Sequence, residues 1–252
     1  MKRSIALVVL FVLSAWVGAQ TVVEHLAAGD AAYERYDNAA ALKHYQAAWQ
    51  LDSTYCETLW KLSRTHTDIG ELADKETQKQ NYTQGLKFAR SAVRHCPDNA
   101  DAHLVLAVSV GRVALMVGGK KKVELSKEVK AEAEKALELD PNKDIAHHVL
   151  ARWHREVTHL SGFLKTFAKI LYGGLPPASD EQAVAHFSKA LQLKPNYINH
   201  HLEMGITYEA MKQWEAARAE YQKVAELPIG AFNDQQHKQE AAERLAKIKD
   251  KK

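Results

Sequence analysis

A short pattern of apolar and small residues recurs along the chain. The phrase EKALELDP occupies residues 134–141, and SKALQLKP occupies residues 188–195. Each phrase keeps apolar residues at helical spacing, and the proline that closes it cannot continue a helix. Aligned through the chain, the pattern places its central small residue at Ala48, Ala92, Ala136, Ala190 and Val224. The pattern therefore predicts a tandem array of helical units.

The spacing of these units predicts the fold class. The intervals between the aligned positions are 44, 44, 54 and 34 residues. The last interval equals the period of the tetratricopeptide repeat, which is a hairpin of two helices. One such hairpin cannot bury its apolar face alone, so neighbouring hairpins stack into a solenoid. We predict an all-α, tetratricopeptide-like solenoid of about five hairpins over residues 20–232, followed by a capping helix in residues 233–252.

The longer intervals add residues between the two helices of a hairpin. Ten extra residues shared between two helices would lengthen each by about five residues, or about 7 Å. The fourth hairpin gains a separate segment, residues 161–180, in which helical spacing aligns one apolar stripe. The stripe consists of Phe163, Leu164, Phe167, Ile170 and Leu171. Two interpretations stay open, a helix packed on the repeats and a mobile lid or membrane-touching helix.

The N-terminus predicts export. Met1 is followed by two basic residues, an apolar run to Val17 and a small-residue exit at Ala19, which is typical of a secretory signal peptide over residues 1–19. An uncleaved anchor is the alternative. We expect a periplasmic or secreted protein. Removal of Lys2 and Arg3 leaves 32 basic and 31 acidic residues, a near balance that gives no reason to expect a nucleic-acid partner.

Several stretches resemble one known family. They are LWKLSRTHTDIG, GLKFARSAV, KKKVELSKEVKAEAEKALELDP, and HHVLARWHREVTHL with the LPPAS loop that follows. Together they are similar to the regulator of microtubule dynamics family. The resemblance implies an all-helical tetratricopeptide-like domain, association with microtubules and organelle membranes, and phospholipid handling in some members. This chain departs from the family at its front end, and an exported, bacterial-type member would not meet microtubules.

The resemblance also implies which residues face the concave groove of the solenoid. The fifth position of each first helix should form an apolar line, at Leu26, Trp60, Leu104, His148 and Leu202. Later positions on the same helices supply Arg64, Val108, Arg112, Arg152, Arg155 and Ile206. Guanidinium groups beside an apolar floor suit an amphiphile with an anionic head. Alternatively, Arg152 and Arg155 pair with Glu156 or stack on Trp153.

Two functions follow from that groove. The first is a non-enzymatic scaffold that holds a protein or peptide partner. The second is a carrier of phospholipid or another anionic amphiphile. The partner's identity and the oligomeric state stay open.

Other candidate chemistry is weak. Thirteen histidines include no metal-binding HExxH pair, and His103, His147 and His201 share one repeat position, which indicates a packing role. VGGKKK lacks the spacing of a phosphate-binding loop, and no GxSxG elbow is present. We expect no enzyme activity, cofactor or metal. The lysines at 120–122 form a solvated tip or contact lipid headgroups or an acidic partner.

The two cysteines predict a disulfide. Cys56 begins the first helix of the second hairpin, and Cys96 follows its second helix. In an antiparallel hairpin these positions meet at the same end. An even pair in an exported chain favours a bond between them.

Overall fold

The computed structural model describes residues 21–172 and 174–252, without the side chains of Lys120, Phe167, Leu171 and Tyr172. The predicted signal peptide, residues 1–19, lies outside the described residues. The same holds for two of the five side chains assigned to the possible lid, Phe167 and Leu171.

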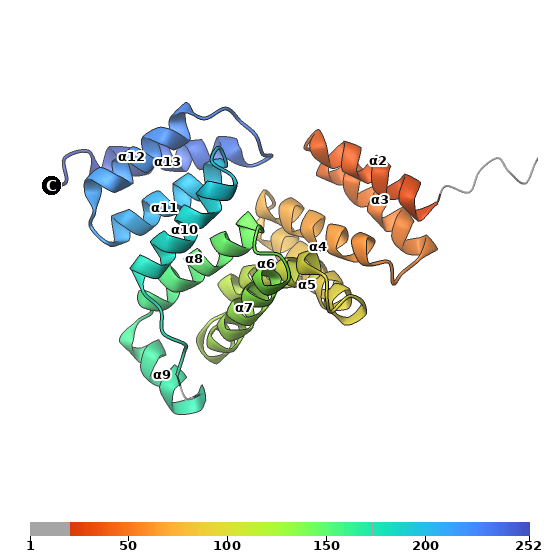
Figure 1. Ribbon diagram of the computed structural model, residues 1–252, viewed down its shortest axis with the longest axis horizontal. Helices are drawn as coiled ribbons and strands as arrows, with labels where there is room; N and C mark the ends of the chain where they lie inside the picture. The colour runs from red at the N-terminus through yellow and green to blue at the C-terminus, as the bar shows by residue number, and fades with distance from the viewer. Residues whose placement is uncertain (1–20, 173) are drawn as a thin grey trace, which may run out of the picture.

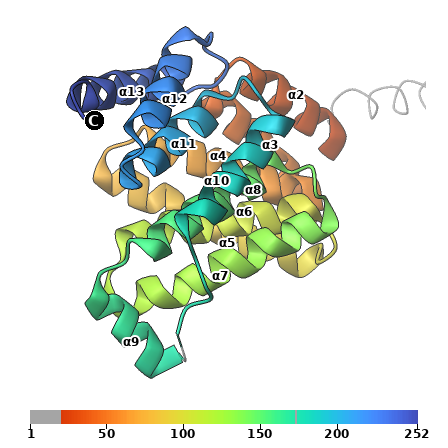
Figure 2. The same ribbon diagram turned by 60° about the vertical axis from the view of Figure 1, so that its left-hand side comes forward.

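The described residues form twelve α-helices and no strand, and ten of the helices pair as five hairpins. The pairs are α2 (Val22–Glu34) with α3 (Asn38–Leu51), α4 (Cys56–Glu71) with α5 (Lys75–His95), α6 (Ala100–Met116) with α7 (Gly119–Leu139), α8 (Asp144–Thr158) with α10 (Asp180–Leu193), and α11 (Ile198–Ala210) with α12 (Trp214–Glu226). Helix α9 (Gly162–Tyr172) is inserted in the fourth hairpin, and α13 (Asp234–Ile248) closes the array. Figures 1 and 2 show the hairpins side by side in an arc. The predicted all-α, tetratricopeptide-like solenoid is confirmed.

Small residues allow the helices of each hairpin to approach closely. The five aligned positions Ala48, Ala92, Ala136, Ala190 and Val224 are completely buried. Glycines on the first helices face tyrosine rings of the second helices at both ends of the solenoid. A Cβ atom added at Gly29 would lie 2.3 Å from Cε1 of Tyr45, and one added at Gly205 would lie 2.5 Å from Cε1 of Tyr221. A larger residue has no room there, so the glycines fix the helix separation.

The second and third hairpins are longer than the last one, but the extra residues are not shared equally. Helices α4 and α6 have 16 and 17 residues, whereas α5 and α7 have 21 each; α11 and α12 have 13 each. The second helix therefore takes most of the gain, about 12 Å in length. In the second hairpin the reason is the turn. The Asp74 carboxylate accepts hydrogen bonds from the backbone N–H groups of Glu76 and Thr77, so α5 begins soon after α4 ends.

Three histidines tie the start of a first helix to the proline that precedes it. Nε2 of His103 donates to the carbonyl oxygen of Pro97 at 2.7 Å, and Nε2 of His201 donates to that of Pro195 at 2.9 Å. His147 repeats the arrangement more loosely, at 3.4 Å from the oxygen of Pro141. These hydrogen bonds give the three histidines a structural role at the hairpin junctions. The bond gives a partner to the carbonyl oxygen of a loop residue that lies just beyond the end of the preceding helix.

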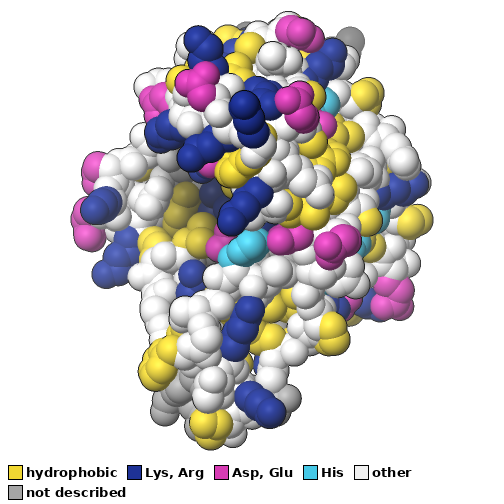
Figure 3. All heavy atoms as spheres, turned by 90° about the vertical axis from the view of Figure 1, so that its left-hand side faces the viewer, with side chains coloured by type: hydrophobic (Ala, Val, Ile, Leu, Met, Phe, Trp, Pro, Cys, Tyr) yellow, Lys and Arg dark blue, Asp and Glu magenta, His cyan; other side chains and the backbone are white. Residues whose placement is uncertain are grey.

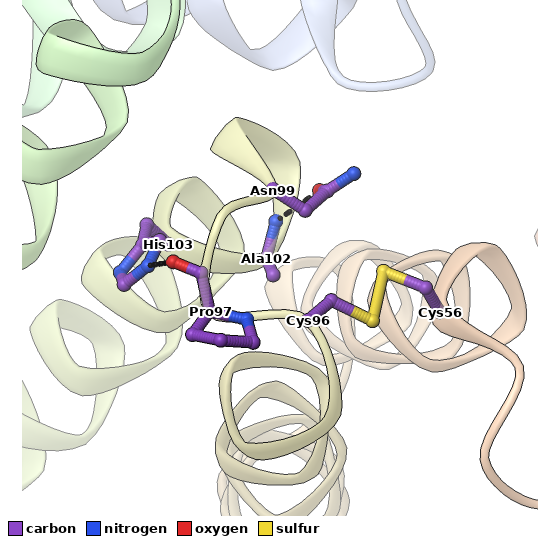
Figure 4. The surroundings of a disulfide bond; sticks show 6 residues. All are labelled: Cys56, Cys96, Pro97, Asn99, Ala102 and His103. Atoms are coloured by element: carbon purple, nitrogen blue, oxygen red, sulfur yellow. Dashed lines mark hydrogen bonds between the residues drawn. A yellow bond between two sulfur atoms is a disulfide. The ribbon is translucent and has the colours of Figure 1, made fainter.

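A disulfide joins Cys56 to Cys96 across the open end of the second hairpin (Figure 4). Their Cα atoms are 6.0 Å apart, within the range that a disulfide requires. The predicted pairing is present. It ties the start of α4 to the end of α5, next to the turn where His103 binds Pro97.

Helix α9 projects from the solenoid and contacts α7 (Figures 1 and 2). Its buried side is Ala168, whereas Phe163 and Ile170 are 77% and 75% exposed. Figure 3 shows hydrophobic atoms alternating with Lys or Arg atoms at this lower end of the molecule. The predicted helix is present, and these two apolar side chains are mostly exposed. Among the described residues, no helix combines the length and the apolar composition needed to cross a bilayer.

Helix α13 covers the open side of the last hairpin. Ala241 and Ile248 are buried against α11 and α12, and Leu245 packs beside them. The apolar stripe of this otherwise polar helix therefore faces the solenoid, which leaves the last hairpin with no bare apolar face.

Candidate functional site

A pocket of about 310 Å³ lies on the inner face of the arc. Helices α4, α6 and α8, the first helices of three successive hairpins, supply most of its wall. The rest of the wall comes from Tyr33 of α2, from three residues of α7, from Tyr197 and Asn199 at the start of α11, and from Phe232 and Asn233 in the loop before α13. The apolar part of the wall includes Leu104, Val105, Val108, Leu115, Val129 and Val149. A largely apolar concavity with a few polar groups is typical of a ligand-binding site.

The pocket brings together about half of the predicted groove residues. Those that line it are Arg64, Leu104, Val108, Arg112, His148 and Arg152. The other five point elsewhere. Leu26 and Leu202 are buried between helices at the two ends of the array, and Ile206 packs beside Leu202. Trp60 packs on the core below the pocket, and Arg155 is buried against α11.

Two of the three arginines that line the pocket, Arg112 and Arg152, have acidic partners. Arg112 lies 2.9 Å from a carboxylate oxygen of Glu71. Arg152 lies 3.3 Å from one carboxylate oxygen of Glu203, and Arg155 donates to the other at 2.6 Å and to the backbone oxygen of Glu203 at 3.0 Å. Burial alone would raise the pKa of Glu203, but these two arginines hold it well below its usual range. Glu203 of α11 is thus the main partner of both arginines.

The pairing with Glu156 that the sequence suggested describes Arg152 and Arg155 only in part. Glu156 lies 3.5 Å from Arg155 and is half exposed, so it is a secondary contact. The guanidinium groups of Arg152 and Arg155 are held by an acid that is about fifty residues away in the chain. An anionic head that contacted either group would have to share it with Glu203.

Arg64 is held by aromatic rings. Its guanidinium carbon lies 3.7 Å from the centre of the Tyr33 ring and 5.1 Å from that of Trp60. Its Nε atom is buried and has no hydrogen-bond partner among the described residues. Beside it, the Tyr33 hydroxyl donates to Asp68 at 2.8 Å, and burial raises the pKa of Asp68 to about 7. At neutral pH this carboxyl group is only partly ionised, which reduces the charge in this part of the pocket.

His148 is the end of a buried hydrogen-bonded chain. Its Nδ1 atom lies 2.9 Å from Nδ1 of His200, and Nε2 of His200 lies 3.0 Å from a carboxylate oxygen of Asp144. His148 reaches the pocket wall, whereas His200 is completely buried. Burial lowers the pKa of His148 well below its usual value, and the neighbouring His200 lowers it further. His148 is therefore neutral at physiological pH.

The comparison that decides the family is with a family model. Residues 25–249 match the model described as regulator of microtubule dynamics protein 1-3. The chain belongs to this family.

Two relatives and one solved structure illustrate the relationship. The chain is 27% identical to regulator of microtubule dynamics protein 1 of Bos taurus over 220 residues, which are 86% of this chain and 69% of the bovine protein. It is 33% identical to protein 3 of Rattus norvegicus over 140 residues, 55% of this chain but only 30% of the rat protein. A thermophilic TPR protein of Thermus thermophilus superimposes with a TM-score of 0.65 at 17% identity, covering 90% of this chain and all of the other. At that identity the structural likeness shows the fold alone.

Sequence reasoning missed several side chains of the pocket in this regulator-family chain. Asp68 and Glu71 lie on the same helix as Arg64, one and two turns further on. Helical spacing from Arg64, applied to every turn of that helix, would therefore have placed them in the groove. Tyr197 and Phe232 come from turns between helices. No spacing rule places a loop residue against a helix, and these two could not have been found.

Proposed function

We propose that this chain is a non-enzymatic scaffold that binds a partner polypeptide by taking an apolar segment of it into the pocket. The observation that carries the proposal is an apolar wall beside which two arginines, Arg112 and Arg152, are already paired with acids of the same chain. A volume of about 310 Å³ is roughly twice that of a cavity that holds benzene. It accommodates one or two large apolar side chains. The tetratricopeptide-like fold also suggests a protein-interaction scaffold.

The ion pairs favour an uncharged occupant. A carboxylate or phosphate that engaged Arg152 would compete with Glu203, which is nine-tenths buried and cannot easily regain water. Burial of apolar surface, by contrast, needs no rearrangement of charges and contributes about 25 cal/mol per Å² before the costs of association.

A second candidate, binding of an anionic amphiphile, rests on a different observation. Nε of Arg64 has no hydrogen-bond partner, and Lys122 at the pocket wall forms no ion pair, within the part of the chain that the structure describes. An anionic head placed near these two cations would leave the ion pairs of Arg112 and Arg152 intact. The apolar wall would then hold the rest of the molecule.

We retain export as part of the proposal. The disulfide between Cys56 and Cys96 supports it, because disulfides persist in oxidising compartments and are rare in reducing ones. The partner would then be a periplasmic, secreted or surface-exposed polypeptide.

The test is photo-crosslinking from the pocket. A photoreactive amino acid at Val108 is compared with one at Leu51, an apolar residue that is 54% exposed and lies outside the pocket. We expect one polypeptide to crosslink from position 108 and not from position 51, to be identified by mass spectrometry, and then to be used in a binding assay.

The binding assay decides between the candidates. Leu104→Glu places a charge on the apolar wall and should weaken binding of that polypeptide at least about tenfold, since a carboxylate is costly to bury, while Leu51→Glu should not. Undiminished binding by a folded Leu104→Glu variant would refute the proposal. Phospholipid in organic extracts of protein purified without detergent, absent from Leu104→Glu, would instead favour the amphiphile.

A further inference from the structure

We propose that His148 presents a fixed hydrogen-bond acceptor to the pocket, so that the pocket selects an apolar side chain carrying a neutral donor, tyrosine or tryptophan rather than phenylalanine. The inference rests on the proposed function, because it assumes that the pocket takes part of a partner polypeptide. The inference also specifies the chemical group that the bound segment must carry, a neutral hydrogen-bond donor.

The direction of the hydrogen bonds is set at Asp144. This residue begins α8, where the positive end of the helix dipole stabilises a carboxylate, and His200 and Lys194 add to that effect. Although burial would raise the pKa of Asp144, these groups bring it below its usual value. A carboxylate can only accept hydrogen bonds, so Nε2 of His200 must carry the proton that it donates to Asp144.

The remaining proton positions follow in turn. Burial lowers the pKa of His200, so its imidazole is neutral and carries one proton, and its Nδ1 atom is an acceptor. The 2.9 Å contact between the two Nδ1 atoms then requires that Nδ1 of His148 donates. Nε2 of His148 is left without a proton and has a lone pair to offer.

The free nitrogen is available to the pocket. No hydrogen bond joins Nε2 of His148 to another described residue, and the atom is not among those sealed inside the protein without a partner. The ring is held edge-on by Phe187, with the centroids 5.4 Å apart, and His148 lines the pocket. The nearest charged groups, Arg152, Arg155 and Glu203, are engaged with one another.

The consequence is selectivity for a donor. An apolar group that carries O–H or N–H can satisfy Nε2, whereas an isostere without the donor leaves this acceptor buried and unsatisfied. Sites built around a buried polar group discriminate strongly against ligands that lack the matching group. Apolar side chains such as Val149 and Leu104 also line the pocket, so an apolar group that donates to His148 would be held in one orientation.

The first experiment measures the proton positions without any ligand. Long-range ¹H–¹⁵N spectra of histidine-labelled protein at neutral pH distinguish protonated from unprotonated ring nitrogens. We expect His148 in the form protonated at Nδ1, which is the minor form of a free imidazole. Asp144→Asn should yield a mixture, because an amide can either donate or accept. His148 protonated at Nε2 in the wild-type protein would overturn the inference.

The second experiment measures selectivity with p-cresol, the side chain of tyrosine, and 4-methylanisole, in which a methyl group replaces the donated proton. We expect the wild-type protein to bind p-cresol about three- to tenfold more tightly, the range that one net hydrogen bond provides. His148→Phe should bind both probes equally. Asp144→Asn should narrow the preference although Asp144 does not line the pocket. This last result assigns Asp144 a positioning role, since a merely structural residue would change binding of both probes alike.

The outcomes separate this inference from the proposed function. Equal binding of the two probes by wild-type protein, or binding of neither, overturns the inference. The proposed function is judged by the crosslinked partner and Leu104→Glu. A partner that depends on Leu104 while the probes show no difference would therefore remove the donor requirement alone.

Discussion

Replacing Glu203 by glutamine should destabilise the protein by about 3 kcal/mol. The carboxylate of Glu203 accepts from Arg155 at 2.6 Å and faces Arg152 at 3.3 Å, and only about a tenth of its side chain is exposed. Glutamine keeps one acceptor oxygen for Arg155 but turns an N–H₂ group toward Arg152. The change removes one charge-assisted bond, about 1.5–3 kcal/mol, and weakens the other. Breaking a buried ion pair typically costs about 3–5 kcal/mol, and the partial exposure of Arg152 places this case at the lower end.

The assay is urea unfolding followed by circular dichroism, with Glu156→Gln as the matched control. Glu156 is half exposed and lies 3.5 Å from the same Arg155, so its loss should cost less than about 0.5 kcal/mol. In thermal unfolding, Glu203→Gln should lower Tm by about 6–12 °C for a chain of this size. A loss below 1 kcal/mol, or equal losses for the two variants, would refute the view that Glu203 holds both arginines.

The same variant predicts a pH dependence. In the folded protein the pKa of Glu203 lies below its usual value, so folding stabilises the ionised form. Its contribution is complete above the pKa of an unfolded glutamate, about 4.3, and is lost as the pH falls toward the lower folded value. The stability difference between the wild-type protein and Glu203→Gln should therefore be constant from pH 8 to pH 6 and shrink below about pH 4.

Two other predictions concern the disulfide and α9. Thiol titration of the unfolded, unreduced protein should find no reactive cysteine, and a variant with both Cys56 and Cys96 changed to serine should lose about 4 kcal/mol in the chain-entropy model for a 40-residue separation; two reactive thiols before reduction would contradict the bond. Ile170→Ala should change the free energy of unfolding by less than about 0.5 kcal/mol, because the side chain is 75% exposed. A larger loss would mean that α9 packs on the repeats, whereas weaker liposome binding at unchanged stability would favour a membrane-touching helix.

The repeat architecture could be predicted from the sequence alone. Small residues recur at every close contact between paired helices, and all five aligned positions are completely buried. Close packing leaves no room for a larger side chain at such a contact, so the local pattern contains this information. The cysteine pair and the apolar stripe of α13 were also predictable, because each depends only on positions within one hairpin or one helix.

Only the folded solenoid shows which groove residues share a pocket, which of their charged groups are paired and where the protons lie. Leu26 and Leu104 occupy the same repeat position, yet one is buried between hairpins and the other lines the pocket. In the folded arc, the same repeat position has different neighbouring residues in different hairpins. A periodic sequence pattern contains no information about these neighbours. From the sequence, Arg152 was expected to bind an anion, but it pairs with Glu203 of the next hairpin. His148 is hydrogen-bonded to His200, which is hydrogen-bonded to Asp144. Charge pairing and proton positions depend on distances of about 3 Å between helices that are some fifty residues apart in sequence, and only the packed solenoid sets those distances.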